Sequence, residues 1–65
     1  MAGADGRDVY VELIAQGNVV KATAIDSQTG IEATIVGPAS AGRAALEAAA
    51  IRKLEYLLKK QRGES

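Results

Sequence analysis

Alternating apolar and polar positions mark three short segments in the first half of the chain. Val9–Ala15, Val19–Asp26 and Ile31–Val36 each show a side-chain period of two, which is typical of β-strands with one buried face. Between them lie Gln16–Asn18 and Asp26–Gly30, which are rich in residues that favour tight turns. The pattern therefore predicts two successive hairpins, and hence an antiparallel three-stranded meander.

The second half of the chain carries a helical pattern. Gly37 and Pro38 are expected to end the sheet, because proline cannot donate to a β-ladder, and Ser40 is a candidate N-cap. From Ala41 to Gln61 the residues are good helix formers, and Leu54 is the centre of an apolar stripe. The stripe that should face the sheet consists of Ala44, Leu46, Ala50, Ile51, Leu54, Leu57 and Leu58.

The two halves together predict an α+β fold, a three-stranded antiparallel β-meander followed by one long C-terminal α-helix packed on one sheet face (β-β-β-α). Roughly 20 helical residues extend about 30 Å and seven-residue strands only about 23 Å, so the last helical turns are expected to overhang the sheet. We expect a single domain at residues 8–62, with disordered tails at residues 1–7 and 63–65, which are small and polar.

Length and composition point to marginal stability. A chain of 65 residues buries only about 60% of the surface of its unfolded state, and without cysteine it has no disulfide. Homo-oligomerisation is therefore the expected reinforcement. No apolar run approaches the roughly 18–20 residues that span a bilayer, and the first residues lack an apolar leader, so we expect a cytoplasmic protein with no membrane contact.

Charge is balanced overall but unevenly distributed. The formal net charge is zero, yet residues 1–39 carry five acidic and two basic side chains, a net charge of −3. Residues 40–65 carry six basic and three acidic side chains, a net charge of +3. The folded molecule is therefore expected to be electrically polar.

The residue supply argues against catalysis. Histidine, cysteine, tryptophan and phenylalanine are absent, and no nucleophile stands beside a base. We therefore expect a protein that is not an enzyme, with no catalytic residue, cofactor or metal ligand. Glu47 lies within the apolar stripe, but one turn after Arg43, so an ion pair is favoured over a buried acid or base. The turn at residues 37–42 shows only a weak similarity to an anion-binding loop.

Two surfaces are candidates for binding. The first is on the helix, where the residues on the side away from Leu54 are Arg52, Tyr56, Lys59 and Lys60; exposed tyrosine and arginine are enriched at interface centres. The alternative is a solvated face, with Glu55 paired to Lys59 and the tyrosine ring over the stems of Arg52 and Lys60. The second is the uncovered sheet face. If Val20, Ala22 and Ala24 meet the helix, that face is lined by Tyr10, Ile14, Val19, Ile25 and Val36.

Residues Gly37 to Leu58, after a three-stranded meander, resemble the carboxyl half of a double-stranded-RNA-binding domain. Its small residues in the last helix match Ser40, Ala44, Ala48 and Ala49. The phosphate-binding lysines of that family are replaced here by Ala41, Gly42 and Ala45, and its first helix has no counterpart before Val9. The resemblance therefore implies the fold more than the function.

A second resemblance covers about residues 9–60. It rests on six short stretches, namely Gly17-Asn18, Val20-Lys21, Ala24–Asp26, Thr29-Gly30, Ile35–Pro38 and Arg52–Tyr56. Together they are similar to a family of small uncharacterised proteins from alphaproteobacteria. This resemblance implies a compact bacterial cytoplasmic domain and no particular activity.

These observations predict a non-enzymatic protein-interaction module, an adaptor or regulator that self-associates or binds a larger protein. The alternative is a weak RNA-binding module whose contacts come from the basic side chains Arg43, Arg52, Lys53, Lys59 and Lys60. A third class, a ligand binder or small enzyme, would use the turn at Ser40.

Overall fold

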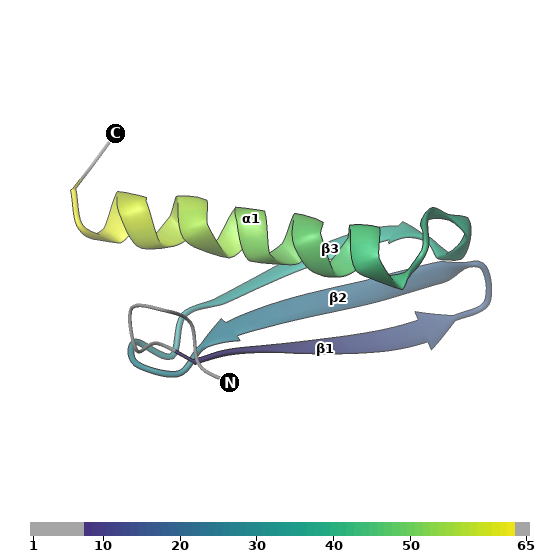
Figure 1. Ribbon diagram of the computed structural model, residues 1–65, viewed down its shortest axis with the longest axis horizontal. Helices are drawn as coiled ribbons and strands as arrows, with labels where there is room; N and C mark the ends of the chain where they lie inside the picture. The colour runs from purple at the N-terminus through teal and green to yellow at the C-terminus, as the bar shows by residue number, and fades with distance from the viewer. Residues whose placement is uncertain (1–7, 64–65) are drawn as a thin grey trace.

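The structure, a computed structural model, describes residues 8–63. The element order is β1 (Val9–Gln16), β2 (Val19–Asp26), β3 (Glu32–Pro38), a short 3-10 helix η1 (Ala39–Ala41) and α1 (Arg43–Gln61). The strands form one antiparallel sheet in the order β1-β2-β3, and α1 lies across one face of it (Figure 1). The predicted α+β meander with a C-terminal helix is confirmed.

The ends of the described chain bear on the predicted boundaries. Of the disordered tails expected at residues 1–7 and 63–65, residues 1–7 and 64–65 lie outside the described residues. Gly63 is described, and its N–H donates to the carbonyl oxygen of Lys60 at 3.0 Å, so its backbone is bonded to the last turn of the helix. Its φ of 83° is the left-handed conformation common just after a helix.

The core is formed by buried alanine side chains, most of them on the sheet, that pack against buried leucine side chains of the helix. Ala22, Ala24 and Ala33 of the sheet and Ala50 of the helix are almost completely buried. Such small side chains let the helix approach the strands closely, and Leu54, only 1% exposed, is the largest apolar side chain fully buried between the layers. The remaining buried core residues are Val20, Leu46 and Leu58.

The helix starts later than the sequence pattern predicts. Ser40 lies in η1 and caps nothing; the N-cap of α1 is Gly42, which has no side chain to offer. The prediction of Ser40 as N-cap was therefore wrong. The reason is local: Gly42 has a φ of 91°, which interrupts the helical backbone and favours glycine, and its N–H closes η1 on the carbonyl of Ala39.

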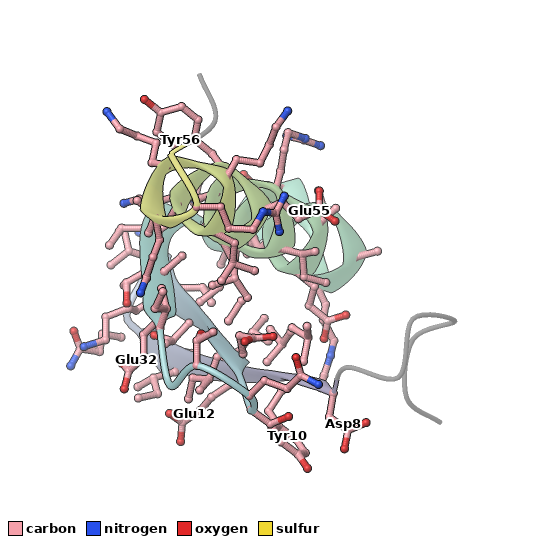
Figure 2. All side chains as sticks on the ribbon, turned by 90° about the vertical axis from the view of Figure 1, so that its left-hand side faces the viewer. Asp8, Tyr10, Glu12, Glu32, Glu55 and Tyr56 are labelled. Atoms are coloured by element: carbon pink, nitrogen blue, oxygen red, sulfur yellow. The ribbon has the colours of Figure 1, made fainter. Side chains whose placement is uncertain are left out.

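The helix does not cover the three strands equally. It packs mainly on β3 and β2 and much less on β1. On the β3 side, the Lys53 Nζ donates to the carbonyl oxygen of Thr34 at 2.9 Å. On the β1 side, Val11 and Leu13 are only half-buried, and Val9 is 39% exposed. The end-on view shows the same offset, with α1 above the β3 side of the sheet (Figure 2).

The stability of this thin core should depend on Leu54. We expect Leu54→Ala to lower the free energy of unfolding by about 2–5 kcal/mol, because the neighbouring alanines cannot fill the cavity. Urea unfolding followed by circular dichroism measures the loss. Leu57→Ala is the control, since Leu57 is only half-buried and should cost clearly less. Equal losses for the two variants would contradict the central role of Leu54.

Candidate interaction surfaces

The sheet face that points away from α1, here called the outer sheet face, carries every residue predicted for the second surface. The strand register arranges it in four cross-strand rows. These rows are Tyr10–Ile25–Glu32, Glu12–Thr23–Thr34, Ile14–Lys21–Val36 and Gln16–Val19–Pro38. Tyr10, Glu12 and Glu32 all project from this side (Figure 2).

The apolar side chains of the outer sheet face form two groups. Tyr10 is 59% exposed, and its cross-strand neighbour Ile25 is half-buried. The second group comprises Ile14, Val19 and Val36, with Val36 the most exposed at 65%. Between the groups runs the row of Glu12, Thr23 and Thr34, in which the two threonine Oγ1 atoms are hydrogen-bonded at 3.0 Å. The predicted second surface is therefore one face divided by a polar row.

The second candidate surface lies on the helix and is called here the basic helix face. Its residues, Arg52, Tyr56, Lys59 and Lys60, are all exposed and point away from the sheet. Tyr56 is 59% exposed, and the Lys60 Nζ lies 5.7 Å from the centroid of its ring, within range of a cation–π contact. The last turn of α1 extends past the β2–β3 turn, so the predicted overhang is confirmed (Figure 1).

The remaining charged side chains of the helix have other contacts. Arg43 Nε and Glu47 Oε2 form the predicted ion pair at 2.9 Å, and Lys53 is bonded to β3. The expected Glu55–Lys59 ion pair is not formed in the described chain. Glu55, Leu58, Lys59 and Arg62 instead line an open hollow of about 220 Å³ on one side of the helix. Of the five basic residues considered for RNA binding, Arg52, Lys59 and Lys60 thus remain directed at solvent.

The structure also contains a buried carboxylate that the sequence did not reveal. Asp26 is fully buried at the end of β2, and its Oδ2 accepts hydrogen bonds from the Thr29 N–H at 2.9 Å and the Thr29 Oγ1 at 2.8 Å. Its Oδ1 has no hydrogen-bond partner among the described residues. The Asp-x-x-Thr-Gly signal predicted the turn, whereas the burial follows from the helix-facing position of Asp26 in β2.

Asp26 is a structural residue in this setting. Its backbone also closes the β2–β3 turn, with Gly30 N–H donating to its carbonyl at 2.8 Å and its own N–H donating to Ile31. Within residues 8–63, no group of three or more acidic side chains could hold a metal ion. No helix in that same part of the chain is long and apolar enough to cross a membrane.

Comparison with known proteins places the chain in a family. Residues 6–61 match the family described as Domain of unknown function (DUF6898), and the chain belongs to it. No curated protein and no solved structure matches the chain. The predicted membership of an uncharacterised family is thereby confirmed, whereas the alphaproteobacterial origin and the resemblance to an RNA-binding domain stay predictions.

Removing the Asp26 carboxylate should weaken the β2–β3 turn. We expect Asp26→Ala to lower the free energy of unfolding by about 1–3 kcal/mol, because the Thr29 amide and hydroxyl lose their acceptor. Urea unfolding gives the value, and Ser27→Ala in the same exposed turn is the control. An Asp26→Ala variant as stable as the control would contradict this role.

Proposed function

We propose that this chain is a non-enzymatic protein-interaction module that self-associates or binds a larger protein. The observation that carries the proposal is the exposure of large apolar side chains on the outer sheet face, where Tyr10, Ile14, Val19 and Val36 are each 42% exposed or more. When one face of an antiparallel sheet packs on a helix, the residues along each strand normally alternate, so that the other face carries polar side chains. Exposed apolar side chains gathered on one surface are typical of a contact site.

The basic helix face supports the same proposal from the opposite side of the molecule. Its Tyr56 is a large amphipathic side chain held beneath a lysine, and tyrosine and arginine are enriched where proteins meet. The outer sheet face carries Glu12 and Glu32 against Lys21, whereas Arg52, Lys59 and Lys60 project from the helix. A partner could therefore be selected by charge as well as by shape.

The non-enzymatic part of the proposal rests on what the side chains do. The chain contains no histidine or cysteine, and the one fully buried carboxylate among residues 8–63 is hydrogen-bonded to a turn. The hydroxyl of Thr29 donates to that same carboxylate, and the hydroxyls of Thr23 and Thr34 bond to each other. A nucleophile would need a base within hydrogen-bond reach and an exposed position.

The proposal predicts that weakening the outer sheet face abolishes association. In Ile14→Thr/Val36→Thr the β-branched character is kept at both positions while apolar surface is lost, so the sheet should remain folded. We expect the complex with a larger protein, retained from ribonuclease-treated host cytosol, to weaken at least tenfold.

The matched control acts on the other surface. Arg52→Ala/Tyr56→Ala removes the centre of the basic helix face and should leave association through the sheet unchanged. Loss of binding only in this variant would move the site to the helix. A wild-type chain that stays monomeric at about millimolar concentration and retains no protein would overturn the proposal.

RNA binding is the second candidate, favoured by the common exposed face of Arg52, Lys59 and Lys60. Three phosphate contacts would give a log–log salt dependence with a slope of about −2 to −3. Fluorescence anisotropy with labelled single- and double-stranded RNA measures it, with Lys59→Glu/Lys60→Glu as the test and Lys21→Glu on the sheet as the control. We expect no binding beyond the non-specific level; a steep slope abolished only by the helix variant would favour the RNA module.

A further inference from the structure

The two edges of the sheet are treated differently by the rest of the molecule. Along β3, the Lys53 Nζ bonds to the outward-pointing carbonyl of Thr34, and the strand ends in Pro38, which has no N–H. Proline on an edge strand, and covering of the edge by a neighbouring helix, are common means of preventing further strand pairing. Strand β1 has neither feature. It is eight residues long and carries a single charged side chain, Glu12.

The hydrogen-bonding pattern shows which groups of β1 are directed outward. The Ser27 N–H donates to the carbonyl of Asp8, and in antiparallel pairs the hydrogen-bonded residues alternate. The even-numbered residues of β1 therefore bond to β2. The residues whose N–H and C=O groups point away from the sheet are Val9, Val11, Leu13 and Ala15. Within residues 8–63 these groups have no hydrogen-bond partner.

The side chains of the same four residues lie on the helix-facing side of the sheet, where α1 leaves them partly uncovered. Val11 and Leu13 are half-buried, and Val9 and Ala15 are exposed. On the helix, Ile51 lies about 160° around the axis from Lys53 at 100° per residue. Because Lys53 reaches β3, Ile51 belongs to the flank above β1, and it too is half-buried. Open backbone groups and unfinished apolar packing thus coincide along one strand.

We infer that β1 pairs antiparallel with β1 of a second copy of this chain, which joins two three-stranded sheets into one of six strands. This inference rests on the proposed self-association and places it at the β1 edge, whereas the outer sheet face is left to contact a larger protein. A second copy fits because antiparallel pairing of one strand with itself is two-fold symmetric, so the same groups are satisfied on both sides. The formal net charge of zero means that two copies do not repel each other overall.

The side-chain pattern limits the register of this pairing. Both copies must present their helix-facing side chains on the same face of the joint sheet, so one residue of β1 meets itself at the two-fold axis. An axis at Glu12 would place two carboxylates directly opposite, with Cα atoms about 4.5 Å apart. An axis at Val11 or Leu13 avoids this and gives three hydrogen-bonded residue pairs along the new edge. An axis at Tyr10 or Ile14 would give only two hydrogen-bonded residue pairs within β1.

Disulfide trapping tests the contact, because the chain has no cysteine of its own. Val11→Cys and Leu13→Cys each place a thiol at one of the two allowed axes. A hydrogen-bonded antiparallel pair has a Cα separation of about 5.5 Å, which a disulfide spans. Gln28→Cys, in the exposed β2–β3 turn and outside both candidate surfaces, is the control for random collision. Val36→Cys, on the outer sheet face, reports contact between outer faces. Under mild oxidation at micromolar concentration, we expect one β1 variant to form covalent dimer at least tenfold faster than the control.

A backbone substitution gives an independent readout. Val11→Pro removes an outward N–H that β2 does not use, and Val11→Thr keeps that N–H with a side chain of similar shape. We expect sedimentation equilibrium to find a monomer for the proline variant and a dimer for the threonine variant, both folded by circular dichroism. If the proline variant does not fold, hydrogen exchange of the wild type decides: the amides of residues 11 and 13, together with residue 9 or residue 15 according to the register, should gain protection as protein concentration rises.

The results that overturn this inference differ from those that overturn the proposed function. Faster trapping of Val36→Cys than of either β1 variant would show contact between outer sheet faces, which keeps the interaction module and removes the edge pairing. A wild-type monomer that binds a different protein would do the same. A wild-type monomer with fast-exchanging β1 amides that binds nothing would remove both.

Discussion

The packing of Leu54 on buried alanine side chains is the constraint from which the rest of this structure follows. In the described part of the chain, α1 alone forms the second layer, so a single line of contact has to hold the sheet. Ala22, Ala24 and Ala50 are fully buried and add little apolar area each, but they let the helix approach closely enough for Leu54 to be enclosed. A core of this kind leaves little reserve, because a domain of this size buries a modest share of its surface.

The position of the helix then decides which surfaces stay open. Gly37 contributes here, since a Cβ at this residue would lie 2.6 Å from the Leu46 Cδ2, and its absence admits Leu46 beside β3. With Leu46 there and Lys53 bonded to Thr34, α1 is held toward β3 at both its first and middle turns. Covering β3 and β2 well means covering β1 poorly. The exposed edge of β1 is thus a consequence of where α1 lies on the sheet.

Periodicity predicted the elements and their faces, because a period of two or of 3.6 records which side chains are buried. It could not predict how the helix lies across the sheet. The contact of Lys53 with Thr34 joins residues 19 positions apart and depends on that placement. The start of the helix was missed because Gly42 adopts a φ of 91°, which interrupts the helical backbone. The preference of serine for N-cap positions cannot place the helix start before this interruption. The burial of Asp26 was missed because the sequence signal at this residue predicted only a turn. The burial follows from the helix-facing position of Asp26 in β2, which is a different property.

The sequence predicted which residues form the candidate surfaces. The strand register of the sheet is needed to show what kind of contact each surface can make. The outer sheet face offers side chains, and the row containing Thr23 and Thr34 divides them, so a partner there would have to meet a polar strip between two apolar groups. The edge of β1 offers backbone groups at a fixed spacing, which specify direction and register for any strand that joins them. Side-chain contact on the face can select among partners. Backbone pairing at the edge can join two sheets into one continuous sheet. Within residues 8–63, a single copy has α1 on three strands and leaves the backbone groups at the edge of β1 unpaired.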